Sequence, residues 1–248
     1  MPRSIDLNCD MGEIPEAIAD GTQESLMPNL TSVNIACGGH AGDDQTMKIT
    51  IEQAIRWKLG VGAHPGYADP ANFGRKELDL PPEAIADSVY EQVTRFAEVA
   101  ASCGVPVMHV KAHGALYNQA VRDRTIAEAI ANGVARWSRD VVLMGLAGSP
   151  MLDVFRNAGF AVAAEAFADR RYEADGTLRS RKFDDALIRD PAEAAQHALR
   201  IVEQGTAQTI CIHGDTPGAP QIAAAVAKLL REEGVELRAL GDFLRTAS

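Results

Sequence analysis

The stretch PVMHVKAHGALYN, residues 106–118, shows the unit from which this chain is built. A short apolar run typical of a buried strand leads into His109 and His113, and Gly114 then opens a helix-like stretch. Three other stretches repeat this order, namely VNIACGGHAGD with His40, GVGAHPGY with His64 and TICIHGDTPGA with His213. We therefore expect repeated strand–helix units whose strands carry histidines near their carboxyl ends.

Seven apolar runs predict strands, and stretches with helical spacing separate them. The expected strands are 4–8, 32–37, 60–64, 106–111, 141–145, 160–166 and 208–213, and VELRAL near the end adds a short one. The expected helices are 44–59, 82–103, 123–137, 150–158, 191–204 and 219–233. The dipeptides Ser149-Pro150 and Asp190-Pro191 are helix-start signals, because proline is tolerated in the first helical turn.

This alternation predicts an α/β fold with a parallel sheet. Residues 1–248 contain no linker or change of composition, so we expect a single domain. Seven strands either close into a barrel or lie open as a doubly wound sheet, and periodicity does not decide between the two. In a closed barrel the carboxyl ends of all strands meet at one rim, where the histidines would gather in a single pocket.

Composition narrows the class of protein. The chain is 46% hydrophobic and 23% charged, with a formal net charge of -10, which is typical of a soluble protein and disfavours nucleic acid or an anionic membrane as a partner. We see no signal peptide and no apolar run of membrane-spanning length, so we expect a cytoplasmic protein. The four cysteines form no C-x-x-C pair and are expected to be small buried hydrophobes.

Alternation of side chains along a strand places several polar residues on one face. In IDLNCD this face holds Asp6, Asn8 and Asp10, and in PVMHVKAH it holds His109, Lys111 and His113. Asn34 and His213 belong to the corresponding faces of their strands. Because buried polar groups are costly unless paired, this set indicates either a satisfied internal network, such as Asp6 with Lys111, or an active site.

The residue types allow specific roles within such a site. Asp10, His40 and His64 form a donor set for a divalent metal ion. Lys111 and His113 suit stabilisation of an oxyanion, and Asp10 suits either metal binding or the orientation of an imidazole. One of His40, His64 and His213 is the expected general base, and Asp215 is a neighbouring carboxylate that could hold the His213 ring. The remaining inward polar residues are expected to bind substrate, namely Asp6, Asn8, Asn34, His109 and Asp215.

A long irregular segment at 168–189 carries five cations between Arg170 and Lys182, among several acidic residues. At this length the segment is expected to have a function. Its arginines either clamp a phosphate or are balanced by the acidic residues in a solvated loop. We expect Arg170 to bind substrate.

Six motifs, taken together and in order, resemble the LamB/YcsF family, which supplies the A subunit of bacterial 5-oxoprolinase. They are DLNCDMGE at 6–13, LMPNLTSVNIACGGHAGD at 26–43, GAHPGYAD at 62–69, HVKAHGALYN at 109–118, EAFADRRY at 165–172 and CIHGDTPGA at 211–219. The resemblance implies an irregular seven-stranded parallel β/α barrel of the glycoside hydrolase and deacetylase type. It also adds Glu165 to the residues expected to bind substrate.

The activity implied by the resemblance is ATP-dependent opening of the lactam ring of 5-oxo-L-proline to L-glutamate, with ATP hydrolysed to ADP and phosphate. ATP is then a cosubstrate, and the two other 5-oxoprolinase subunits, B and C, are partners. Two alternatives stay open. The chain could be a metal-dependent amide or acyl hydrolase that needs no ATP, or a non-catalytic subunit that binds substrate for its partners.

Departures from the family pattern lie beside the expected pocket. Gly39 stands where the family usually has phenylalanine, and Ala112 where it usually has proline. The stretch EIPEAIADGTQES is short and polar, and past Arg179 the residues 180–188, SRKFDDALI, replace a segment that is usually proline-rich. These differences leave the exact substrate open.

Overall fold

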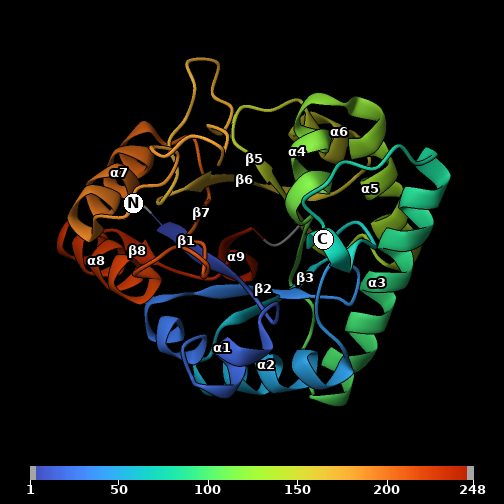
Figure 1. Cartoon of the computed structure of the whole chain (residues 1–248), viewed down its shortest axis with the longest axis horizontal. Coiled ribbons are helices and arrows are strands. Elements are labelled where there is room, and N and C mark those ends of the chain that lie inside the picture. The colour runs from blue at the N-terminus through green and yellow to red at the C-terminus, as the bar shows by residue number, and fades with distance from the viewer. Residues whose placement is uncertain (1–3, 245–248) are drawn as a thin grey trace.

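Seven parallel strands form a closed barrel in the computed structural model, which describes residues 4–244 (Figure 1). The barrel strands are β1 Ser4–Met11, β2 Ser32–Ala36, β3 Gly60–His64, β4 His109–Lys111, β5 Val142–Leu146, β6 Ala161–Phe167 and β7 Thr209–Cys211. The eighth strand, β8 Glu236–Leu237, adds to the edge of β1. The strand expected from VELRAL is thus confirmed.

Strand β1 closes the barrel, because it pairs with both β2 and β7. Asp10 is in register with Asn34 of β2, and Asn8 with Cys211 of β7. The other strands pair in chain order from β2 to β7. The expected β/α barrel is confirmed, and the open doubly wound sheet is excluded.

Helices surround the barrel and alternate with its strands (Figure 1). They are α1 Pro15–Ala19, α2 Asp44–Arg56, α3 Pro82–Ser102, α4 Gly114–Arg122, α5 Arg124–Trp137, α6 Met151–Asn157, α7 Pro191–Gln204, α8 Ala219–Glu232 and α9 Leu240–Phe243. Two 3₁₀ turns, η1 Glu24–Asn29 and η2 Pro70–Asn72, lie in the loops. Within the described residues, none of these helices is long and apolar enough to cross a membrane.

Local signals explain where the helices begin and end. The Asp190 carboxylate accepts a hydrogen bond from the Glu193 amide and so caps α7, as the Asp-Pro dipeptide predicted. Gly205 then ends α7 in the left-handed conformation, with φ of 67°. Helix α6 begins at Met151, one residue later than expected, and strand β4 begins at His109, three residues later than expected.

The hydrophobic core lies between the barrel and the helices. Outward-facing strand residues such as Leu7 and Ile210 are fully buried against helical residues such as Phe96 and Ile222. Burial of each such side chain contributes about 1.5–3 kcal/mol of transfer free energy. The opposite face of β1 and its neighbours points into the barrel and carries the polar residues.

Candidate active site

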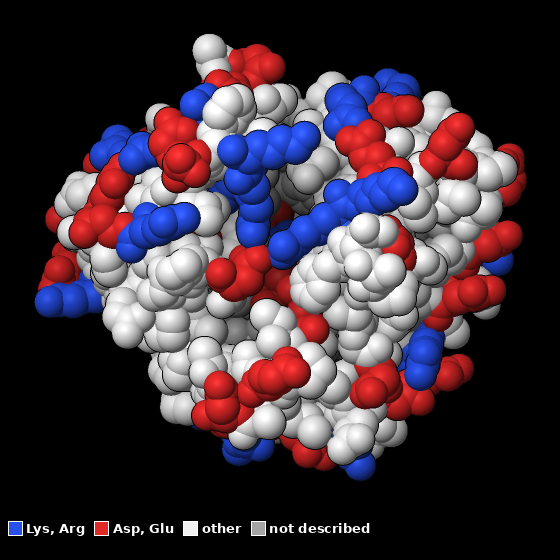
Figure 2. Space-filling view, in the orientation of Figure 1, with Lys and Arg blue, Asp and Glu red and all other residues white. Residues whose placement is uncertain are grey.

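A pocket of about 760 Å³ opens at the carboxyl ends of the barrel strands. This size is typical of a small-molecule site. Lys and Arg side chains surround a hollow on this face of an otherwise acidic protein, with acidic groups at its edge (Figure 2). The residues that line the pocket come from the strand ends, from α4 and from the segment 168–189, which we call the arm.

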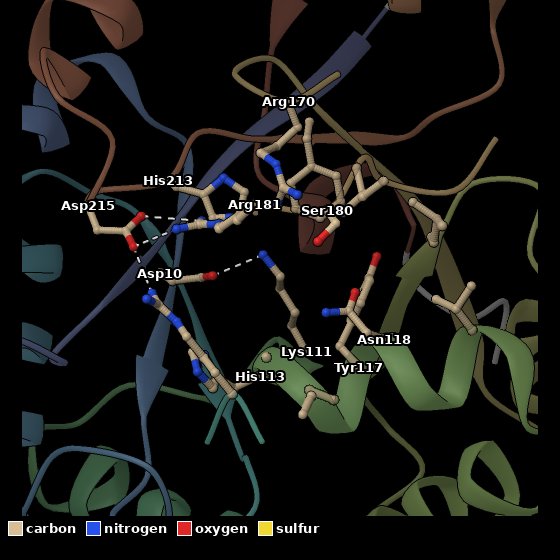
Figure 3. Close-up of a pocket in the computed structure, with 18 of the residues that line it drawn as sticks. Asp10, Lys111, His113, Tyr117, Asn118, Arg170, Ser180, Arg181, His213 and Asp215 are labelled. Carbon is tan, nitrogen blue, oxygen red and sulfur yellow. Dashed lines mark hydrogen bonds and ion pairs between the residues drawn. The ribbon is translucent and has the colours of Figure 1, made fainter. Parts of the chain in front are cut away.

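Lys111 occupies the floor of the pocket, with only 3% of its surface exposed (Figure 3). Its Nζ lies 2.9 Å from Asp10 Oδ1 and 2.8 Å from Glu165 Oε1. The Cys211 sulfur is 3.2 Å from the same nitrogen. Burial alone would lower the pKa of Lys111, but the neighbouring carboxylates hold it well above its ordinary value. Lys111 is therefore a fixed positive charge facing the ligand space.

Asp10 connects Lys111 to the imidazoles. Its Oδ1 accepts hydrogen bonds from Lys111 and from the side-chain amide of Asn34, at 2.8 Å in the latter case. Its Oδ2 lies 3.3 Å from His64 Nε2. Burial would raise the pKa of Asp10, but His64 and Lys111 lower it well below its ordinary value. Asp10 therefore stays ionised at neutral pH.

Three histidines and a glutamate meet on the wall beside Asp10, and we call this group the histidine cluster. It consists of Glu13, His40, His64 and His113, with one ligand atom from each within 4.8 Å of every other. Glu13 Oε1 lies 2.9 Å from His40 Nε2 and 3.0 Å from His113 Nδ1. The rings of His40 and His113 stack at a centroid distance of 3.6 Å. This group is a candidate metal-binding site.

A second charge pair joins His213 to Asp169. Nδ1 of His213 lies 2.9 Å from Asp169 Oδ1, while Thr216 donates to the other carboxylate oxygen at 2.6 Å. The His213 ring also stacks on Phe167. Burial would raise the pKa of Asp169, but His213 and Thr216 lower it below its ordinary value. The carboxylate thus orients the ring, and His213 itself lines the pocket.

Arginines cross the mouth of the pocket. Arg75 and Arg181 both form salt bridges with Asp215, at 2.7 and 2.8 Å (Figure 3). Arg170 is 7% exposed and donates to the Arg179 carbonyl. Within the described residues Arg170 makes no salt bridge with a carboxylate, and its Nε has no hydrogen-bond partner. Burial and the nearby Arg181 charge lower the pKa of Arg170, which marks a position where an anion would be stabilised.

Two more buried polar atoms are the hydroxyl oxygen of Tyr117 and one carboxylate oxygen of Glu165. Neither makes a hydrogen bond of ordinary geometry among the residues described between 4 and 244, although burial and the nearby Glu165 raise the pKa of the Tyr117 hydroxyl. Tyr117 lines the pocket beside Asn118 (Figure 3). Buried polar atoms are normally paired, so this wall offers unused contacts to a bound molecule.

Deeper in the barrel, Asp6 forms a separate network. Its carboxylate accepts hydrogen bonds from the hydroxyls of Thr31, Ser32 and Thr209. The residue is fully buried and does not line the pocket. The structure therefore places Asp6 beneath the pocket surface and not on its wall, and Lys111 pairs with Asp10 and Glu165 instead of with Asp6.

Asn8, Asn34 and His109 also lie below the pocket surface. His109 Nε2 donates to Asn34 Oδ1 at 2.8 Å, and Asn34 donates to Asn8 Oδ1 at 2.7 Å. All three side chains are fully buried, and none lines the pocket. They support Asp10 from beneath, which differs from the direct contact with substrate that we expected.

Sequence reasoning missed two carboxylates. Glu13 follows Gly12, whose φ of 75° turns the chain inward, so strand alternation does not predict its direction. Asp169 takes the place beside His213 that we expected Asp215 to occupy, and Asp215 binds arginines instead. The sequence does contain a signal for Asp169, because this residue continues the two-residue alternation of Glu165 and Phe167 at the end of β6. The expected metal set Asp10, His40 and His64 lies together but lacks Glu13.

The departure at Gly39 has a clear structural counterpart. A Cβ atom at this position would lie 2.3 Å from Gln92 Oε1. Gln92, on α3, fills that space and forms hydrogen bonds with both the amide and the carbonyl of Gly66. A larger residue at position 39 therefore requires a different residue at 92. Ala112 is buried, and nothing in the structure explains why alanine stands there.

Comparison with known proteins identifies the family of the chain. The model of the LamB/YcsF family matches residues 5–245. The A subunit of a 5-oxoprolinase from Chloroflexus aggregans is 46% identical, with 95% of this chain and 98% of the relative covered. The crystal structure of a lactam utilization protein from Thermus thermophilus matches with a TM-score of 0.88 at 39% identity, covering 95% of this chain and 99% of that one.

A more distant match concerns the fold alone. The catalytic domain of a peptidoglycan N-acetylglucosamine deacetylase from Eubacterium rectale has a TM-score of 0.54 at 9% identity, covering 97% of this chain and 89% of that one. The barrel is therefore of the type found in deacetylases. Because the family model spans nearly the whole sequence and the relatives align over their full length, the chain belongs to the LamB/YcsF family.

Proposed function

We propose that this chain is the A subunit of a 5-oxoprolinase, a hydrolase that opens the lactam of 5-oxo-L-proline to L-glutamate. The names of its relatives support this activity, and the pocket has the groups that the reaction needs. Opening a strain-free lactam is uphill, so the reaction is coupled to hydrolysis of ATP to ADP and phosphate. ATP is then a second ligand, and the B and C subunits are the protein partners, in the cytoplasm.

The observation that carries the proposal is the fixed positive charge of Lys111 on the pocket floor. Negative charge develops on the amide oxygen as the lactam carbon is attacked or as this oxygen takes up a phosphoryl group. A preorganised ammonium in a site of low dielectric stabilises such charge more than water does. Asp10 and Glu165 hold the ammonium in place, so little reorganisation is needed during the reaction.

His213 is the proposed general base. Asp169 accepts from Nδ1, so the neutral ring presents the lone pair of Nε2, and the residue lines the pocket. Phosphoryl transfer to the amide oxygen makes the lactam carbon electrophilic. Water then adds to this carbon as His213 takes its proton, the C–N bond breaks with a proton going to nitrogen, and a second hydrolysis releases phosphate. Correctly placed general bases contribute about 10²–10⁴-fold.

Arg170 is the proposed partner of an anionic ligand group. A carboxylate or a phosphoryl group fits a buried guanidinium, because each offers two oxygens to its N–H groups. The pocket is far larger than a five-membered lactam, so it has room for further ligand groups beside Arg75 and Arg181. The size of the pocket therefore supports binding of both the carboxylate of 5-oxoproline and the phosphates of ATP in one site.

The decisive experiment is co-expression with the B and C subunits, followed by measurement of ADP and glutamate formed from 5-oxoproline. We expect both products in equal amounts, and none when this chain is omitted. Glutamate formation without ATP would favour the ATP-independent hydrolase. Binding of 5-oxoproline by this chain, with turnover unaffected by substitutions in its pocket, would favour the non-catalytic binding role.

A further inference from the structure

The histidine cluster has hydrogen bonds that fix which ring nitrogens carry protons. His64 Nδ1 lies 2.7 Å from the Lys111 carbonyl, and His113 Nε2 lies 3.0 Å from the Phe73 carbonyl. Because a carbonyl oxygen only accepts, each of these nitrogens must donate. In the neutral rings the other nitrogens, His64 Nε2 and His113 Nδ1, therefore have free lone pairs.

These two lone-pair nitrogens face each other at 3.0 Å. Glu13 Oε1 lies 3.0 Å from His113 Nδ1 and 3.7 Å from His64 Nε2. Three electron-rich atoms at such distances repel one another unless a proton or a cation lies among them. The spacing is close to that of ligand atoms around a tetrahedral zinc ion, roughly 3.3 Å, because each zinc–ligand bond is about 2.0–2.1 Å.

His40 supplies a third nitrogen to the same place. Its Nε2 is 2.9 Å from Glu13 Oε1, and the side chain is buried, with 1% of the residue exposed. The same Glu13 oxygen lies 3.0 Å from His113 Nδ1, so one carboxylate oxygen faces both rings. The cluster thus offers three imidazoles and one negative charge, which together favour a divalent cation.

We propose that Glu13, His40, His64 and His113 bind one divalent transition-metal ion of the zinc type at the edge of the pocket. Imidazole-rich donor sets select zinc and similar ions, whereas Mg²⁺ and Ca²⁺ need oxygen ligands. Glu13 Oε1 contacts both His40 and His113, whereas Asp10 is paired with Lys111 and approaches only His64 of these rings, so Glu13 is the carboxylate of this site. The proposal stands apart from the lactam-opening function, because no step proposed above uses an ion.

The proposed metal site borders the ligand pocket and is not a structural metal site remote from it. Glu13, His64 and His113 line the pocket, while His40 lies behind them and is 1% exposed. His64 Nε2 is only 3.3 Å from the carboxylate that holds Lys111. An ion here would add positive charge next to the ammonium, so it would polarise a carbonyl or phosphoryl oxygen bound between them.

The test is isothermal titration of the whole chain, stripped with a chelator and dialysed, with ZnCl₂ and separately with MgCl₂. We expect one Zn²⁺ per chain with a Kd below about 1 µM, and no measurable Mg²⁺ binding. Absence of Zn²⁺ binding by the folded wild-type chain would overturn the proposal. Because the readout is metal binding, this failure is distinct from failure of the lactam-opening activity.

Two variants locate the ion, and a third controls for loss of a histidine. Glu13→Gln and His113→Ala should each weaken Zn²⁺ binding at least about 100-fold, since even second-shell changes cost 10–100-fold. His197→Ala, on α7 and outside the cluster, should bind Zn²⁺ like wild type. Thermal melting without metal checks that each variant folds, and only chains with the intact cluster should gain melting temperature with Zn²⁺. Unchanged binding in both cluster variants would contradict the site.

Discussion

Two polar networks share the interior of one barrel, and comparing them distinguishes polar residues with a structural role from those of the candidate active site. Asp6 and Asp10 lie on the same face of β1, and their side chains are mostly or fully buried. The lower carboxylate, Asp6, is satisfied by hydroxyls and reaches no pocket. The upper one, Asp10, faces Lys111 and His64 beside unpaired polar atoms and a ligand-sized space.

The contrast shows that a polar residue on an interior face is not thereby a site residue. Hydroxyl partners complete the hydrogen bonds of Asp6, so it requires no ligand. Nearer the rim, Arg170 lines the pocket and its Nε has no partner among the described residues, so a bound molecule would supply one. Depth along β1 therefore predicts the effect of a substitution.

The largest effect is expected for Lys111→Ala. This substitution removes the fixed positive charge and leaves Asp10 and Glu165 facing each other. Turnover in the assembled enzyme should fall about 10²–10⁴-fold, measured as glutamate formed from 5-oxoproline. Circular dichroism would confirm that the variant is folded. Turnover within about threefold of wild type would remove Lys111 from the site.

The next largest effect is expected for Asp169→Asn. Asparagine keeps the shape of the side chain but lacks the negative charge with which Asp169 holds the His213 ring in its orientation. We expect kcat to fall about 100-fold with little change in KM, because the loss concerns the reacting state more than binding. Asp215→Asn is the matched comparison, since Asp215 contacts arginines and not His213, and it should change KM more than kcat.

A smaller effect is expected for Arg170→Gln, which removes the buried positive charge proposed to bind an anionic ligand group. Hydrogen bonds to charged groups contribute about 1.5–3 kcal/mol, so KM for 5-oxoproline or for ATP should rise roughly 10- to 100-fold. Steady-state kinetics with each substrate varied in turn would show which anion Arg170 binds. No change in either KM would contradict the proposed anion contact.

Asp6→Asn should change stability and leave turnover within about threefold of wild type. Burial raises the pKa of Asp6 to about 6, whereas the unfolded value is 3.8. The folded protein therefore keeps this proton to higher pH than the unfolded chain does. The unfolding free energy contributed by Asp6 is present below about pH 4 and is lost as pH rises through about 6.

Urea unfolding at several pH values would measure this contribution. The stability of wild type relative to Asp6→Asn should fall by about 3 kcal/mol at most between pH 4 and pH 7, because asparagine does not titrate. A difference that stays constant with pH would show that Asp6 does not take up a proton on folding.

Much of the barrel was predictable from the sequence, and the reasons are physical. Apolar runs and helical spacing indicated each barrel strand, and alternation within β1 and β4 pointed Asp10 and Lys111 inward. Closure was not predictable from periodicity, because it depends on β1 pairing with β2 and β7 at once. The resemblance to a known family, and not the spacing, supplied that part of the fold.

The site was predicted less completely, since loops placed its missing members. Gly12 turns the chain so that Glu13 enters the histidine cluster against the alternation of the strand. Asp169 lies in the first turn of the arm, where the neighbouring arginines suggested a phosphate clamp instead. Alternation also gave no measure of depth, which is why Asp6 and Asn34 were expected in the pocket wall.

The most direct measurement compares Asp10→Asn with Asp6→Asn in the same assembled enzyme. Both replace a carboxylate on one strand face by its amide, and only their depth and partners differ. We predict that Asp10→Asn lowers glutamate formation at least about 100-fold while Asp6→Asn stays within about threefold. Equal losses, or a greater loss in Asp6→Asn, would contradict the division of the barrel interior into a structural floor and a reactive rim.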